Sequence, residues 1–186
     1  MRRILCIGDS NTYGCDPRGP FGARYGADTR WTELLDGWEA INCGQNGLCI
    51  PRAPEFPDAA ALLRRFRPLD AVMLMLGSND LLCGASAETA ARRMEALLRF
   101  VAAEAGDARV LLVAPPPMRL GDWVPSRALI DESARLAAAY RRVAEAAGVA
   151  FADAGAWGVA LCFDGVHFSP EGHAAFAAGL SAALNA

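Results

Sequence analysis

The chain has 186 residues, a length that suits one domain, and we expect a single domain over residues 1–186. Hydrophobic residues make up 53% of the sequence and charged residues only 21%, which argues against intrinsic disorder. The formal net charge is −3, so the bulk field does not attract nucleic acid. All 18 basic residues are Arg, and without Lys both a Walker A phosphate loop and a Schiff-base mechanism are excluded.

Membrane insertion and export are not indicated. No apolar run approaches the roughly 18 residues of a membrane span, and the apolar stretch near the N-terminus is short and runs into Asp9. The six cysteines are scattered, with no Cys-x-x-Cys pair, which favours reduced thiols over disulfides or a zinc site. We expect a cytoplasmic protein that binds neither membrane nor nucleic acid.

Five short apolar runs predict buried strands. Because they are continuous rather than alternating, both faces of the sheet should be covered, as in parallel sheets. The runs are 3–8, 40–43, 70–76, 109–114 and 149–152.

Amphipathic stretches between these runs predict helices. One helix follows Pro57, the next runs from the cap Ser86 to Gly106, another ends at Gly148, and the last begins at Ser169. Strands that alternate with helices predict an α/β fold: a doubly wound, flavodoxin-like, five-stranded parallel sheet with helices on both faces. The long loops 16–27 and 44–57 are expected to be functional.

Polar blocks follow the strands and should meet at one edge of the sheet, beyond the carboxyl ends of the strands. In chain order the blocks are 8–12 (GDSNT), 42–47 (NCGQNG), 77–80 (GSND) and 164–167 (DGVH).

These blocks contain the parts of a serine-based acyl-transfer site. Ser10 is a poor nucleophile unless a base takes its proton, and His167 is a suitable base. Asp164 could hold the other ring nitrogen of His167, and the backbone N–H groups of Ser10 and Gly47 with the Asn79 amide could bind an oxyanion. Each part alone is also explained by a helix cap, a turn or a structural histidine. The joint occurrence in this order points to catalysis.

The other histidine, His173, follows a helix cap and a first-turn proline. We expect its ring to cover a strand end or to meet solvent, with no catalytic role.

The four blocks together resemble the SGNH (GDSL-type) esterase/lipase superfamily over nearly the whole chain. Segments 3–14, 28–35, 75–80, 111–118 and 164–173 look most like the arylesterase/acyltransferase group. The resemblance implies Ser10 as nucleophile, His167 as base, Asp164 as its orienting partner, and an oxyanion hole of Ser10, Gly47 and Asn79. It also implies that neither a metal nor an organic cofactor is needed.

Three features depart from the family pattern. Asn11 replaces the apolar residue that is common after the serine, and Gly44 is a rival to Gly47 as oxyanion donor. The loops at 44–57 and 106–109 are shorter than in better-known arylesterases. Because such inserts shape pockets and oligomer contacts, the resemblance does not fix the acyl-chain limit or the assembly, and a homo-oligomer is one possible state. The Gly-x-Ser-x-Gly elbow of α/β-hydrolases is absent.

Several further side chains, within and outside the blocks, receive an interpretation as well. We expect Trp123 in the pocket wall, Val166 on the acyl side, and Asp9 and Asp80 as braces of the site loops. The Arg pairs at 64–65, 92–93 and 141–142 are expected on solvated helix faces.

The sequence thus predicts a serine esterase that hydrolyses short-chain carboxylic esters, such as aryl or alkyl acetates, through an acyl-enzyme, with acyl transfer to alcohols as a further outcome. Alternatives with the same triad are a carbohydrate O-deacetylase and a lysophospholipase or thioesterase. A flavodoxin-like binding module is the non-enzymatic alternative, although no Gly-x-Gly-x-x-Gly follows the first strand. The expected partner is a small-molecule ester.

Overall fold

Five parallel strands form one sheet in the computed structural model, which describes residues 1–186. Their order in the sheet is β2-β1-β3-β4-β5, the doubly wound, flavodoxin-like arrangement that the sequence predicted. Every predicted strand is present, and each end lies within two residues of its expected place. The strands are β1 (Arg2–Gly8), β2 (Trp38–Gly44), β3 (Ala71–Met75), β4 (Arg109–Ala114) and β5 (Ala150–Asp153).

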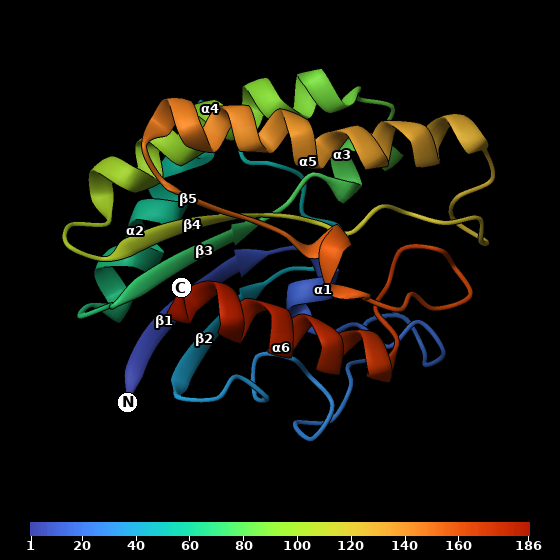
Figure 1. The fold of residues 1–186 in the computed structure, drawn as a ribbon, viewed down its shortest axis with the longest axis horizontal. Coiled ribbons are helices and arrows are strands. Elements are labelled where there is room, and N and C mark those ends of the chain that lie inside the picture. The colour runs from blue at the N-terminus through green and yellow to red at the C-terminus, as the bar shows by residue number, and fades with distance from the viewer.

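Both faces of the sheet are covered, because successive side chains of a strand point to opposite faces. In β1, Leu5 and Ile7 belong to a core of 29 buried residues, whereas Ile4 and Cys6 belong to a second core of 18. The larger core lies between the sheet and the helices at the top of Figure 1, and the smaller one between the sheet and the last helix, on the opposite face.

The long helices begin at capping residues. Ser86, Ser126 and Ser169 each accept a hydrogen bond from a backbone N–H in the first turn of the helix that follows. Gly148 ends one of them in the left-handed conformation. The helices are α2 (Phe56–Phe66), α4 (Ala87–Glu104), α5 (Arg127–Ala147) and α6 (Pro170–Asn185), with single 3₁₀ turns η1 (Ala53–Glu55) and η2 (Ala154–Trp157).

Two short helices were not predicted, α1 (Ser10–Tyr13) and α3 (Ser78–Leu82). Four or five residues are too few to show a helical period in the sequence. Each follows the end of a strand, β1 and β3 respectively, so the first and third polar blocks sit side by side at the carboxyl edge of the sheet.

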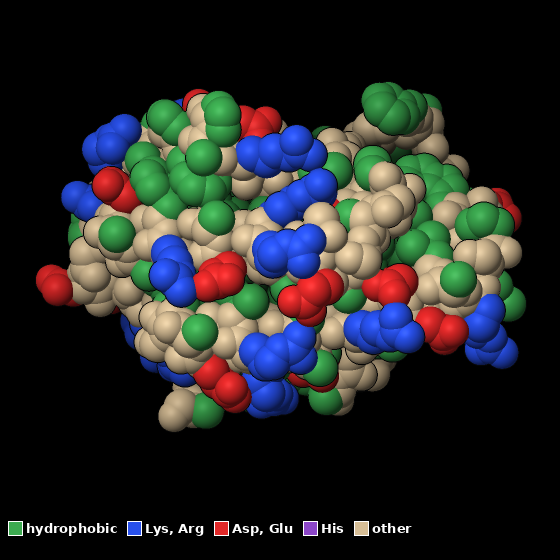
Figure 2. Space-filling view, turned by 90° about the horizontal axis from the view of Figure 1, so that it is seen from above, with side chains coloured by type: hydrophobic (Ala, Val, Ile, Leu, Met, Phe, Trp, Pro, Cys, Tyr) green, Lys and Arg blue, Asp and Glu red, His purple; other side chains and the backbone are tan.

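The outer face of α4 and α5 mixes Arg with acidic side chains (Figure 2). Arg92 and Arg142 are exposed there, as expected of a solvated face. Arg93 is different, because its guanidinium lies 2.6 Å from the buried carboxylate of Asp80. Arg93 is therefore only partly solvated, with its side chain 30% exposed, because it pairs with a buried charge. None of the helices has the length and apolar character needed to cross a membrane.

Candidate active site

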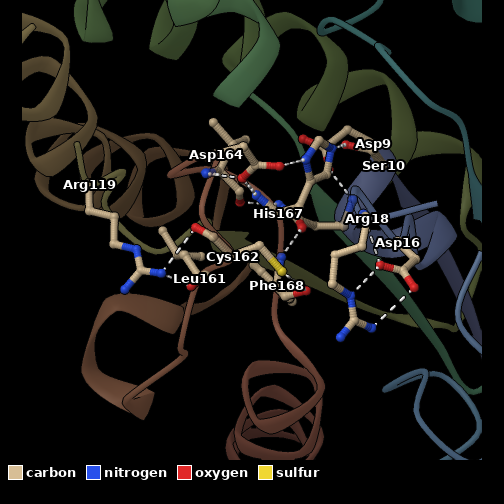
Figure 3. Close-up of polar contacts among 12 residues, drawn as sticks. Asp9, Ser10, Asp16, Arg18, Arg119, Leu161, Cys162, Asp164, His167 and Phe168 are labelled. Atoms are coloured by element: carbon tan, nitrogen blue, oxygen red, sulfur yellow. Dashed lines mark hydrogen bonds and ion pairs between the residues drawn. The ribbon is translucent and has the colours of Figure 1, made fainter. Parts of the chain in front are cut away.

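Ser10, His167 and Asp164 form a hydrogen-bonded series (Figure 3). The Oγ atom of Ser10 lies 3.0 Å from Nε2 of His167, and Nδ1 of His167 lies 2.6 Å from Oδ2 of Asp164. All three side chains are buried, although Ser10 is 157 residues from His167 in the chain. The fold therefore brings together the three residues that the sequence singled out.

The position of Ser10 is set by the turn from β1 into α1. Asp9 caps the helix, its carboxylate accepting a hydrogen bond from the Asn11 N–H at 3.0 Å. Gly14 ends the helix with φ +91°, a conformation that favours glycine. Ser10 is consequently fixed at the first residue of a one-turn helix rather than in a flexible loop.

Asp164 organises the loop that carries His167. Its Oδ1 atom accepts hydrogen bonds from the backbone N–H groups of Val166 at 2.9 Å and of His167 at 3.0 Å. Its Oδ2 atom remains for the imidazole. One carboxylate thus shapes the loop and fixes the orientation of the His167 ring.

A second loop, after β4, supports the loop of His167. The Trp123 N–H donates to the Asp164 carbonyl at 3.1 Å, and the Arg119 guanidinium donates to the carbonyls of Leu161 and Cys162 (Figure 3). These contacts to backbone carbonyls connect two segments that the sequence could only place at the same edge of the sheet.

The environment separates the pKa values of the two ionisable partners. Burial lowers the pKa of His167, but the hydrogen bonds and negative charge of Asp164 and Cys15 together outweigh burial and raise that pKa to about 9. Burial alone would raise the pKa of Asp164, but the hydrogen bonds it accepts from His167 and from two backbone N–H groups hold it below its ordinary value. Asp164 is therefore ionised at neutral pH and stabilises positive charge on the ring.

Gly47 and Asn79 face the same cavity as Ser10, and the rival Gly44 has a different role. The Gly44 N–H donates to Asn42 Oδ1 at 3.0 Å, and a Cβ on Gly44 would lie 2.1 Å from the Tyr13 backbone nitrogen. Gly44 is thus needed for close packing against α1. The Gly47 N–H has no hydrogen-bond acceptor within the chain and lies at the cavity, so the geometry favours Gly47.

The cavity beside Ser10 has a volume of about 340 Å³. Besides the residues above, its wall comprises Asn46, Trp123, Phe163 and most of the segment 15–22. Trp123 lies in the wall as predicted. Val166 does not: its side chain is buried in the larger core, because neighbouring residues in this turn point to opposite sides. The segment 15–22 was expected only as part of a long functional loop, and no residue in it carried a more specific signal.

His173 is fully buried, so the expectation that it could meet solvent is wrong. It accepts a long hydrogen bond of 3.5 Å from the Trp31 N–H, and its ring contacts those of Tyr25 and Phe168 edge-on. Burial lowers the pKa of His173 to about 4. It is a neutral core residue outside the cavity.

Asp9 and Asp80 brace the site, as predicted. Asp9 caps α1. Asp80 accepts a hydrogen bond from the Ile50 N–H at 2.9 Å, which ties α3 to the loop that contains Gly47.

One contact at the site had only an indirect signal in the sequence. The side chain of Asn11 bonds the backbone on both sides of His167, and the sole hint was a polar residue where relatives commonly have an apolar one. The structure brings together no group of three or more His, Cys, Asp or Glu side chains that could hold a metal ion.

Comparisons with known proteins agree with this geometry. The model of the GDSL-like lipase/acylhydrolase family matches residues 6–175. No curated protein sequence gives a significant match.

Two solved structures are similar over the whole chain. Est24, a carbohydrate acetylesterase from Sinorhizobium meliloti, is 26% identical with a TM-score of 0.85, covering 100% of this chain and 99% of that one. The M. smegmatis aryl esterase is 28% identical with a TM-score of 0.84, again covering 100% and 99%. The chain belongs to the GDSL-like (SGNH) lipase/acylhydrolase family and is a hydrolase of ester bonds.

Proposed function

We propose that the chain is a serine esterase that cleaves short-chain carboxylic esters through an acyl-enzyme on Ser10. The observation that carries the proposal is the series from Ser10 Oγ through His167 to Asp164, with contacts of 3.0 and 2.6 Å, at the wall of an open cavity. A nucleophile within hydrogen-bond reach of a base that is held by a third group is the arrangement this chemistry requires.

In the first half-reaction, Ser10 Oγ attacks the ester carbonyl carbon while Nε2 of His167 takes the hydroxyl proton. The Nδ1–H group of His167 donates a hydrogen bond to the Asp164 carboxylate, which stabilises the imidazolium that forms. The carbonyl electron pair moves to oxygen, where the N–H groups of Ser10 and Gly47 and the amide of Asn79 would donate hydrogen bonds.

Collapse of this intermediate breaks the bond to the leaving alkoxide, which takes the proton from His167 and departs as an alcohol or a phenol. Water then attacks the acyl-enzyme, again losing its proton to His167, and the acid is released with Ser10 restored. An alcohol that replaces water accepts the acyl group instead, which gives acyl transfer by the same steps.

The cavity supports a short acyl group and a neutral ester. Its volume of about 340 Å³ is at the small end of the range for ligand sites. The side chains in its wall include the carboxylates Asp16 and Asp164 but no Arg. Asp16 is paired with Arg18 at 2.9 Å, so the side chains of the wall offer no unpaired cation to an anionic head group such as the phosphate of a lysophospholipid, which disfavours that alternative.

Carbohydrate O-deacetylation is the second candidate, favoured by the mouth of the cavity. Phe21, Trp123 and Phe163 all line the cavity, and all three are exposed. Flat apolar rings in this position suit either an aryl leaving group or the apolar face of a sugar ring. The similarity to Est24, a carbohydrate acetylesterase, supports the same class of substrate.

The proposal is tested with Ser10→Ala. We expect turnover of p-nitrophenyl acetate to fall by at least about four orders of magnitude and covalent labelling by a fluorophosphonate to disappear. Ser78→Ala is the matched control, because Ser78 is another buried serine at the start of a short helix after a strand, and it should still be labelled. Retention of a tenth of the wild-type turnover by Ser10→Ala would overturn the mechanism.

Substrate class is tested with p-nitrophenyl esters of increasing acyl length beside acetylated sugars. Acetyl to butyryl esters should be cleaved faster than a ten-carbon ester. Faster cleavage of the ten-carbon ester would contradict the short-acyl assignment.

A further inference from the structure

The side chain of Asn11 spans the backbone on both sides of His167. Its Oδ1 atom accepts a hydrogen bond from the Phe168 N–H at 2.9 Å, and its Nδ2 atom donates to the Val166 carbonyl at 3.1 Å. Val166 and Phe168 are the two chain neighbours of His167. One planar amide therefore holds the peptide groups that flank the proposed base.

Hydrogen bonds made by the backbone groups of Asn11 hold the residue itself in place. Its N–H donates to Asp9 Oδ1 at 3.0 Å, and its carbonyl accepts from the Trp31 indole at 2.9 Å. The residue is only 3% exposed and does not line the cavity. Because Asn11 directly follows Ser10, it connects the α1 turn that carries the nucleophile to the loop that carries the base.

Apart from the contact of its Nε2 atom with Ser10 Oγ and the edge-on contact with the Trp123 ring, the other contacts of His167 act within its own loop. Asp164 bonds the His167 ring and two backbone N–H groups of the same turn, and the Cys162 N–H donates to the His167 carbonyl at 2.7 Å. These contacts orient the ring relative to the loop. They do not set the distance between the loop and Ser10. That distance depends on contacts between the loop and α1, such as those of Asn11.

The chemistry of this contact requires a primary amide. A side chain that meets both a carbonyl and an N–H must offer one donor and one acceptor, which Asn does with a short, planar group. Leu has the same number of side-chain heavy atoms, branched at the same position, but neither function, so it would leave a buried N–H and a buried carbonyl unpaired.

We propose that Asn11 is a positioning residue that sets the distance between His167 Nε2 and Ser10 Oγ. This inference rests on the proposed function, since it assumes that proton transfer between these two atoms drives the reaction. A displacement of about 1 Å between reacting groups can cost on the order of a hundredfold in rate. Asn11 would thus act on kcat through His167 without touching the substrate.

The test compares Asn11→Leu with Ser133→Ala. Ser133 is also buried, and its hydroxyl also bridges two backbone groups, the Met118 N–H at 2.9 Å and the Ile130 carbonyl at 2.7 Å, outside the cavity. We expect Asn11→Leu to lower kcat on p-nitrophenyl acetate about ten- to a hundredfold, with KM within about threefold of wild type. The rate of fluorophosphonate labelling should fall in parallel. Ser133→Ala should keep kcat and the labelling rate within a few fold of wild type, even if its Tm falls as much as that of Asn11→Leu.

Asn11→Asp is the second variant, should Asn11→Leu fail to fold. It keeps an acceptor for the Phe168 N–H but places a second acceptor against the Val166 carbonyl, so kcat should fall as well. A folded Asn11 variant with kcat within twofold of wild type overturns the inference, as does an equal loss of kcat in Ser133→Ala at equal Tm. If Ser10→Ala stays active, the proposed function has failed instead, which keeps the two failures distinguishable.

Discussion

The ring of Trp123 stands edge-on to the ring of His167, with the ring centroids 5.0 Å apart and the planes at 75°. Trp123 is 54% exposed, whereas His167 is buried. An indole between solvent and the imidazole both limits the access of water to the base and presents an aromatic surface to the incoming ester.

Trp123→Ala should therefore affect aromatic esters most. We expect KM for phenyl acetate to rise several-fold, because the leaving group loses an aromatic contact, while KM for ethyl acetate changes less. Leu120→Ala is the matched control: Leu120 lies in the same loop and is exposed, but does not line the cavity. An equal change in KM for both esters would show that Trp123 does not contact the leaving group.

Asn79→Ala tests the proposed oxyanion donor. The Nδ2 atom of Asn79 lies 3.1 Å from the Leu48 carbonyl, a contact that uses one of its two hydrogens and leaves the other for substrate. We expect kcat to fall by about a hundredfold or more with a smaller change in KM, because the donor acts most strongly on the charged intermediate. If steady-state kinetics instead show a pure rise in KM, Asn79 binds the ground state of the ester.

The pH profile should report His167. Only its neutral form can accept the Ser10 proton, so activity rises with pH through the pKa of His167, which Asp164 and Cys15 raise to about 9 against the effect of burial. The acid limb of the kcat profile should thus have its midpoint well above the ordinary value of about 6.5. In Asp164→Asn the limb should move to lower pH as the anionic partner is lost, and kcat should fall.

The second histidine supplies the control for this profile. His173 has its pKa lowered to about 4 by burial, so it stays neutral over the range in which the limb is measured. A folded His173→Gln variant should therefore keep the wild-type limb. Disappearance of the limb in His173→Gln would mean that the base has been assigned to the wrong histidine.

The site residues that could be predicted from sequence are those whose side chains can perform few chemical roles, such as a nucleophile or a base. Ser10, Asp164 and His167 stand in blocks beyond strand ends, and parallel strands bring such blocks to one edge. The strands themselves were predictable because buried parallel strands are continuous apolar runs. Short α1 and α3 were not, since their formation depends on the sheet from which they emerge.

Side-chain direction at the site is a tertiary property. The adjacent residues Val166 and His167 both follow Asp164, yet one enters the core and the other the cavity. The turn that the Asp164 carboxylate stabilises sets the directions of these two side chains. The contact of Asn11 with the same turn joins segments 155 residues apart, and no local pattern encodes it.

Asp9 gives a prediction on stability. Burial raises its pKa to about 6, above the ordinary value of about 3.9 for an unfolded chain. Between these two values the folded state binds more protons than the unfolded state, so this group lowers stability as pH rises from about 4 to 6, and the cost persists at higher pH. An Asn at this position can accept the same hydrogen bond from the Asn11 N–H without ionising.

Asp9→Asn should therefore gain stability over wild type as pH rises. We expect the two proteins to have similar Tm near pH 4 and the variant to exceed wild type by on the order of 5 °C at pH 8, measured by differential scanning calorimetry. The difference between the two curves cancels all other titrating groups that they share. Asp153→Asn serves as control, because Asp153 caps η2 through the Gly155 N–H at 2.9 Å but is only partly buried. A difference in Tm between Asp9→Asn and wild type that does not change with pH would show that ionised Asp9 carries no cost in the folded state.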